Sequence, residues 1–100
     1  MDKEWFKINI QKIEHYCKKH YIVSFSLFGS ILSSNFNADS DVDILVNFDE
    51  NHIPDFFKLA DMESELEAII GWKVDLRTPE DLSSYFRDDI VAHAESVYVV

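Results

Sequence analysis

The sequence is poor in the residues that mark disulfide-bonded or disordered chains. It has one cysteine, two glycines and two prolines in 100 residues. A lone cysteine, Cys17, excludes an internal disulfide and is typical of a reducing compartment. Few glycines and prolines and no low-complexity tract argue against disorder. We therefore expect a single domain that covers residues 1–100 and resides in the cytoplasm.

Long apolar runs and positive charge are also scarce. No run approaches the roughly 20 apolar residues of a membrane span, and the charged N-terminus is unlike a signal peptide. Nine Lys and Arg stand against 19 Asp and Glu, a net charge of −10. Such a surface repels phosphate backbones, so we expect no direct nucleic-acid binding and no membrane contact. The excess acid favours a basic protein partner or simply aids solubility.

Hydrophobic periodicity predicts the elements around a core for which 47% hydrophobic residues are ample. Apolar residues at steps of three and four, and a strong helix start at Thr78-Pro79, predict helices over about 3–20, 54–70, 78–86 and 87–94. Apolar or alternating runs predict strands over 22–28, 42–48, 72–76 and 96–100. This order indicates an α+β fold, with a small mixed or antiparallel sheet and helices packed mainly on one face.

Several residues of these elements are expected to have structural roles. Cys17 lies on the apolar stripe of the first helix and is interpreted as a core residue. His15 and His20 fall off that stripe, which predicts that both face solvent. Trp5 and Trp72 are interpreted as packing residues.

The most informative pattern is Leu27-Phe28-Gly29-Ser30, followed ten residues later by Asp41-Val42-Asp43. An apolar strand runs into a small-residue turn, and a second strand opens with two acids. Alternate residues of a strand point to the same face, so Asp41 and Asp43 present their carboxylates together. Gly29 lets backbone N–H groups approach a phosphate, Ser30 offers a hydroxyl, and a helix starting here would add donors. The pattern suits a divalent metal and a nucleoside triphosphate.

A third acid, Asp75, stands in the apolar strand Trp72-Lys73-Val74-Asp75-Leu76. Alone it is explained as well by a strand-edge acid paired with Lys73 or Arg77. Together with the Asp41 and Asp43 pair it predicts a cluster of carboxylates that needs a cation. Oxygen ligands without His or Cys indicate Mg²⁺ or Mn²⁺, with two ions possible. Asp75 could also act as general base toward an attacking hydroxyl.

These motifs resemble a known family. Leu27-Phe28-Gly29-Ser30 with Ser40-Asp41-Val42-Asp43-Ile44-Leu45-Val46 looks like the signature of the DNA polymerase β-like nucleotidyltransferase superfamily. The short length and the stretch Val74-Asp75-Leu76-Arg77-Thr78-Pro79-Glu80-Asp81-Leu82 are similar to its minimal, MntA-like members. The resemblance covers about residues 5–98.

The resemblance implies a site and an activity. Gly29 and Ser30 would hold the triphosphate, while Asp41, Asp43 and Asp75 would bind Mg²⁺ and catalyse transfer of a nucleoside monophosphate with loss of pyrophosphate. Such domains are typically encoded beside a HEPN-domain toxin. The resemblance therefore implies an antitoxin that transfers AMP from ATP to a tyrosine of its toxin. The choice of adenine comes only from this resemblance.

One departure from the family pattern keeps alternatives open. Family members often read Gly-Ser-x-Ala-Arg-Gly, whereas this chain reads Gly-Ser-Ile-Leu-Ser-Ser from Gly29 to Ser34. Loss of the arginine removes a positive charge near the phosphates, which Lys73 or Arg77 could replace. The alternatives are an acidic antitoxin that neutralises its partner by contact alone, and a nucleotidyltransferase that acts on RNA or a small molecule.

Overall fold

Four strands form one mixed sheet in the order β3-β2-β1-β4 in a computed structural model that describes residues 1–100. The strands are β1 (Ile22–Phe28), β2 (Val42–Phe48), β3 (Val74–Arg77) and β4 (Glu95–Val99). β1 pairs antiparallel with both β2 and β4, and β2 pairs parallel with β3. A parallel pair needs a crossover between its strands. Here the crossover is α3 (Phe56–Ile70), so β2 and β3 start at the same end of the sheet.

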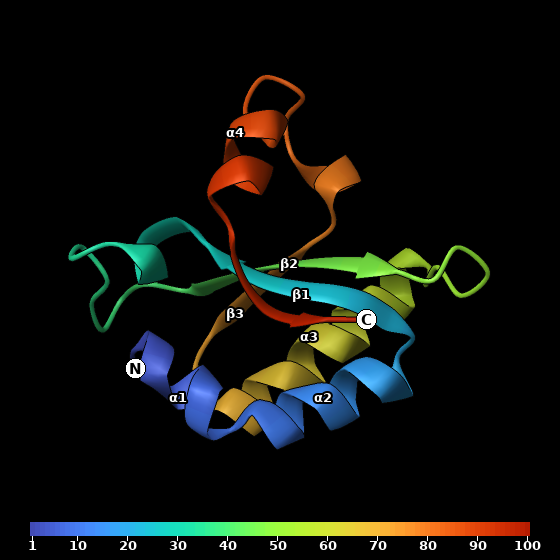
Figure 1. The fold of residues 1–100 in the computed structure, drawn as a ribbon, viewed down its shortest axis with the longest axis horizontal. Coiled ribbons are helices and arrows are strands. Elements are labelled where there is room, and N and C mark those ends of the chain that lie inside the picture. Colours follow the sequence, from blue (N-terminus) through green and yellow to red (C-terminus); the bar gives the residue numbers. More distant parts are fainter.

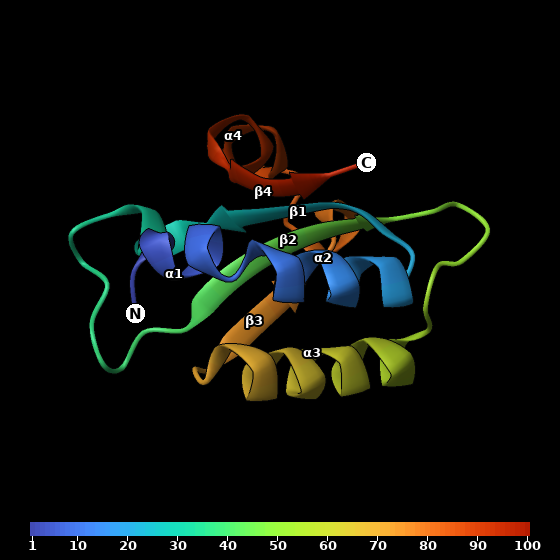
Figure 2. The ribbon, with the colours of Figure 1, turned by 60° about the horizontal axis from the view of Figure 1, so that its bottom comes forward.

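Three helices cover one face of the sheet. They are α1 (Lys3–Ile8), α2 (Ile10–Lys19) and α3, and Figure 1 and Figure 2 show all three on the same side. The short α4 (Arg87–His93) lies on the other side. Two 3₁₀ turns, η1 (Gly29–Leu32) and η2 (Pro79–Asp81), follow β1 and β3. The predicted α+β fold with helices mainly on one face is confirmed. None of its helices has the length and apolar character that crossing a membrane requires.

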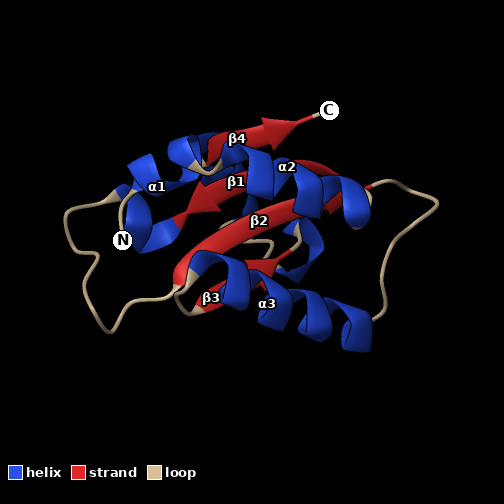
Figure 3. Cartoon of the chain, turned by 90° about the horizontal axis from the view of Figure 1, so that it is seen from below, coloured by secondary structure: helices blue, strands red, loops and turns tan.

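The core lies between the sheet and the helices α2 and α3, which run across its face in Figure 3. α2 contributes Ile13 and Cys17, and α3 contributes Met62 and Leu66. The core role predicted for Cys17 is confirmed: its side chain is fully buried, and burial raises the pKa of its thiol to about 12. The buried Tyr16 hydroxyl donates to the Met62 carbonyl at 2.9 Å, which ties the two helices together.

The N-terminal prediction was wrong in two details. The helix predicted over 3–20 is broken at Asn9, whose side-chain amide donates to the Trp5 carbonyl at 2.9 Å. The Asn9 backbone N–H donates to the same carbonyl at 2.9 Å, so Asn9 ends α1 as its C-terminal cap. His20 is buried rather than solvated, because its Nε2 lies 2.9 Å from Glu65 Oε1 on α3. Periodicity within one helix cannot reveal a partner 45 residues away. His15 is exposed at the helix surface, as predicted.

The region after β3 also differs from its prediction. The helix expected over 78–86 is only the 3₁₀ turn η2, which starts with the predicted Thr78 cap. The Arg87 guanidinium donates to the carbonyls of Pro79 and Leu82 at 2.6 and 3.1 Å. The Leu82 carbonyl is therefore bound by a side chain, and the Pro79 carbonyl is shared between Arg87 and the Leu82 N–H that closes the 3₁₀ turn.

Candidate active site

The sheet brings two of the predicted acids side by side. Asp43 of β2 lies directly opposite Asp75 of β3 in the parallel register. Val42 and Ile44 are buried against the helices, so alternation turns the Asp43 side chain to the face that the three helices leave free. Asp75 is turned the same way by the buried Val74 and Leu76. Asp41 is exposed, just before β2 and two residues from Asp43.

Gly29 lies against Asp43 from the neighbouring strand. Phe28, the last residue of β1, is paired with Asp43, and Gly29 follows it with a φ of +75°. A Cβ on Gly29 would overlap Oδ2 of Asp43. Two independent reasons therefore require glycine here: the left-handed backbone and the close carboxylate.

Ser30 is half-buried in η1, where its carbonyl accepts a hydrogen bond from the Ser33 N–H at 2.9 Å. The helix start expected at this point is a 3₁₀ turn of four residues. So short a turn has no appreciable macrodipole. The turn therefore offers its first backbone N–H groups but no helix dipole, and Ser30 itself remains a predicted phosphate ligand.

The pKa of Asp43, one of the three predicted ligands, is shifted by its surroundings. Burial, followed by the charges of Asp75 and Asp41, raises the pKa of the Asp43 carboxyl to about 6. Arg77 is the one group whose charge lowers that pKa. The half-buried Asp43 carboxylate is thus held in an environment that disfavours its negative charge. A cation at this point would reverse that preference.

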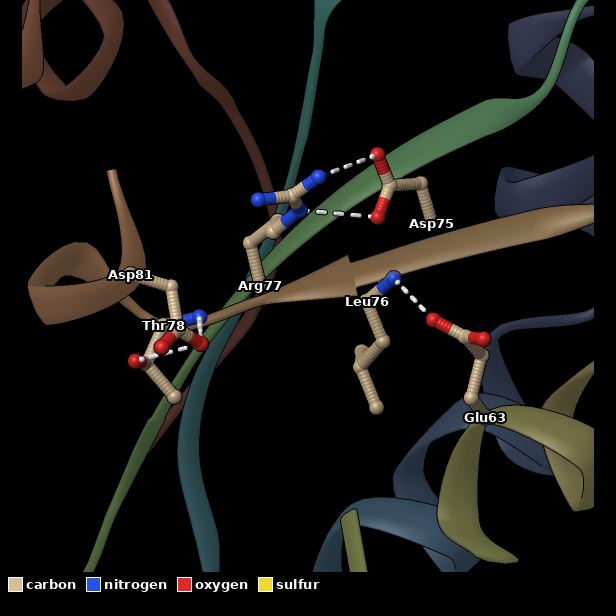
Figure 4. A network of polar contacts seen from close by, with 6 residues as sticks. All are labelled: Glu63, Asp75, Leu76, Arg77, Thr78 and Asp81. Atoms are coloured by element: carbon tan, nitrogen blue, oxygen red, sulfur yellow. Dashed lines mark hydrogen bonds and ion pairs between the residues drawn. The ribbon is translucent and has the colours of Figure 1, made fainter. Parts of the chain in front are cut away.

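Arg77 supplies one positive charge, but it is bound to Asp75. Its Nε lies 2.8 Å from Oδ1 of Asp75, and its Nη2 lies 3.4 Å from Oδ2. Figure 4 shows the guanidinium turned toward both carboxylate oxygens. Asp75 raises the pKa of Arg77 further above its ordinary value. Of the two partners considered for Asp75 from the sequence, the structure selects Arg77 and not Lys73.

The outer edge of β3 is closed by two glutamates that sequence reasoning missed. Glu67 and Glu63 of α3 accept hydrogen bonds from the backbone N–H groups of Val74 and Leu76, each at 2.9 Å (Figure 4 shows the second). An edge strand with unpaired N–H groups can otherwise bind another chain. The glutamates are four residues apart on one helix face, and this spacing was the available signal.

The geometry agrees with the known relatives of the chain. The family described as "Polymerase beta, Nucleotidyltransferase" matches residues 11–99. The chain belongs to this nucleotidyltransferase family. The protein adenylyltransferase MntA of Thermococcus cleftensis is 41% identical over 73 residues, 73% of this chain and 70% of the relative. A second relative, from Methanocaldococcus jannaschii, is 41% identical over 64 residues, 64% of each chain.

Solved structures place the chain among the minimal members. One protein, provisionally described as a minimal nucleotidyltransferase, has a TM-score of 0.75 and 28% identity and covers 94% of both chains. A Shewanella oneidensis complex, described as a tri-AMPylated HEPN toxin with an MNT antitoxin, has a TM-score of 0.69 and 20% identity. It covers 95% of this chain and 73% of that one. The resemblance of the nucleotidyltransferase to the minimal, MntA-like group is confirmed.

The donor set of this nucleotidyltransferase fits a hard divalent cation. Asp41, Asp43 and Asp75 offer only carboxylate oxygens, which Mg²⁺ prefers. As the side chains stand, no three of them converge closely enough to hold an ion, and Asp75 is bound to Arg77 instead. Burial and the neighbouring carboxylates, which raise the pKa of Asp43, disfavour its negative charge, and a bound cation would stabilise that charge. The residues fit Mg²⁺, and their role as its ligands remains a prediction.

We expect Gly29→Ala to destabilise the fold more than Gly71→Ala. Both glycines have positive φ, but no atom lies within 4 Å of the place that a methyl group would take on Gly71. Gly71→Ala should therefore cost only backbone strain, roughly 1–2 kcal/mol of unfolding free energy. Gly29→Ala should cost roughly 1–3 kcal/mol more, because its methyl group overlaps Asp43. Urea unfolding measures both, and Asp43→Ala should relieve most of the additional cost. Equal losses for the two variants would contradict this packing.

We expect Asp43→Asn to stabilise the metal-free protein at pH 7.5. Because the folded pKa of about 6 lies above the ordinary 3.8, the folded state holds a proton that the unfolded state loses. Stability therefore falls as pH rises from about 4 to 6. The variant avoids this loss and should gain about 1 kcal/mol at pH 7.5, a value reduced for solvent screening of a half-exposed group. Thermal unfolding in EDTA at pH 7.5 and pH 3.5 tests this, and the gain should vanish at the lower pH. A variant that is less stable than the parent at pH 7.5 would contradict it.

Proposed function

We propose that this nucleotidyltransferase transfers AMP from ATP to a tyrosine hydroxyl of a HEPN-type toxin and so acts as an antitoxin. The observation that carries the proposal is the pairing of Asp43 with Asp75 on adjacent parallel strands, with Asp41 two residues before Asp43. Support for the acceptor comes from relatives: one is named a protein adenylyltransferase, and one solved complex contains an AMPylated HEPN toxin. With a net charge of −10, the chain is suited to a basic protein partner.

Each residue has a role in the proposed reaction. Asp41, Asp43 and Asp75 would hold Mg²⁺, which when bound neutralises the triphosphate and the developing charge. Gly29 and Ser30 would border the phosphates, since both lie at the end of β1 beside Asp43. The acceptor oxygen forms a bond to the α-phosphorus, the α–β phosphoanhydride bond breaks, and pyrophosphate leaves. The hydroxyl proton passes to a base, for which Asp75 is the candidate.

A non-catalytic function is the second candidate. The net charge of −10 and the missing arginine after Gly29-Ser30 favour an antitoxin that neutralises a basic toxin by contact alone. In that case the aspartates would be dispensable for neutralisation.

One experiment separates the two functions. The purified chain is incubated with its neighbour-encoded partner, Mg²⁺ and ATP labelled at the α-phosphate, and label on the partner is measured. We expect Mg²⁺-dependent labelling that falls by about 100-fold or more in Asp41→Asn/Asp43→Asn, because transition-state charge is no longer stabilised. Asp61→Asn, an exposed acid on α3, is the matched control and should label normally.

The toxin assay completes the test. Under the proposed function, the folded double variant fails to protect cells from the partner. No label on the partner, with full protection by the double variant, would establish the contact mechanism instead.

A further inference from the structure

Only one basic side chain forms an ion pair with a predicted metal ligand, and it is that of Arg77. The chain has two arginines, and Arg87 is bound to the backbone carbonyls of Pro79 and Leu82. Arg77 ends β3 two residues after Asp75, so both side chains stand on the same face of the sheet. The charges of Asp75, Asp81 and Asp43 all act on Arg77. The Arg77 guanidinium is therefore a positive charge surrounded by carboxylates.

The ion pair occupies the oxygens that a metal would need. Nε and Nη2 of Arg77 face the two different oxygens of Asp75, at 2.8 and 3.4 Å. The side chains are partly open, with 46% of Arg77 and 33% of Asp75 exposed. Partly exposed pairs are weak, about 1 kcal/mol or less, so an incoming divalent ion can displace the guanidinium. A cation on Asp75 would then also repel it.

We propose that Arg77 changes partners when the site is loaded. In the metal-free protein it holds Asp75, and when a divalent ion takes the Asp75 oxygens its guanidinium turns to the triphosphate. This inference rests on the proposed function, because it takes Asp75 as a metal ligand. It gives the chain a positive charge for the phosphates in place of the arginine that its Gly29-Ser30 loop lacks. A guanidinium suits that role, since its planar donors match phosphate oxygens.

The exchange predicts changes of opposite sign for two ligands. In Arg77→Gln, Mn²⁺ alone should bind about five-fold more tightly, because its competitor for Asp75 is gone. The same variant should bind a non-hydrolysable ATP analogue with Mg²⁺ about five-fold more weakly, because a phosphate partner is lost. Electron paramagnetic resonance measures free Mn²⁺, and calorimetry measures the nucleotide. Neither readout depends on turnover.

Two variants test whether contact, rather than overall charge, is responsible. Lys73→Gln removes the same charge from the residue two before Asp75, which makes no ion pair with it, and should leave both affinities within about two-fold of the parent. Arg77→Lys keeps the charge and should restore Mn²⁺ affinity close to the parent value. Thermal unfolding establishes that each variant is folded.

Failure of the exchange and failure of the proposed function give different results. If Mn²⁺ binds the parent and is lost in Asp75→Asn, but Arg77→Gln changes neither affinity or shifts both in one direction, the exchange is overturned while the metal site stands. If Lys73→Gln changes the Mn²⁺ and nucleotide affinities as much as Arg77→Gln does, the effect comes from net charge, and the role of the Arg77–Asp75 contact is overturned. If neither the parent nor Arg77→Gln binds Mn²⁺, both the exchange and the metal-dependent function are overturned.

Discussion

The site depends on the repulsion between two carboxylates that the sheet forces together. Asp43 and Asp75 occupy paired positions on adjacent parallel strands, so the register holds their Cα atoms side by side. Burial of Asp43, followed by the charges of Asp75 and Asp41, raises the pKa of Asp43 to about 6. A fold that only needed stability would be better served by apolar residues here. A bound cation would offset the electrostatic cost of placing the two aspartates together. In its absence, the Arg77 guanidinium neutralises Asp75.

The remaining structure keeps these strands in position. Glu63 and Glu67 bind the outer N–H groups of β3, so α3 fixes a strand of only four residues as the edge of the sheet. On the other side, Gly29 allows β1 to end against the Asp43 carboxylate. Trp72 donates its indole N–H to the Ser40 carbonyl at 2.7 Å, which joins the segments that enter β2 and β3. Contacts from α3, Gly29 and Trp72 therefore all help to position the strands that carry Asp43 and Asp75.

Local patterns predicted the parts of this fold that depend on local chemistry. The bounds of β1 and β2 match the strands predicted over 22–28 and 42–48, and α3 ends at Ile70, where the helix predicted over 54–70 ends. The position of Asp43 beside Gly29 also followed from order and spacing. Of the predictions that failed, only that for His20 depended on a distant partner, Glu65 on α3. The first helix breaks at Asn9, and Arg87 binds the Leu82 carbonyl that a longer helix after Thr78 would need. The Asp75–Arg77 pair was one of two possibilities, because strand spacing places Lys73 and Arg77 equally near Asp75.

The central claim is that the three aspartates converge on a divalent cation at the open face of the sheet. Crystals of the chain soaked in Mn²⁺ and an ATP analogue, with data collected for anomalous scattering of manganese, test it most directly. We expect an anomalous peak about 2.1 Å from carboxylate oxygens of Asp43 and Asp75, with Asp41 turned toward it and Arg77 detached. A fully loaded crystal with manganese elsewhere, and with Arg77 still bound to Asp75, would contradict it.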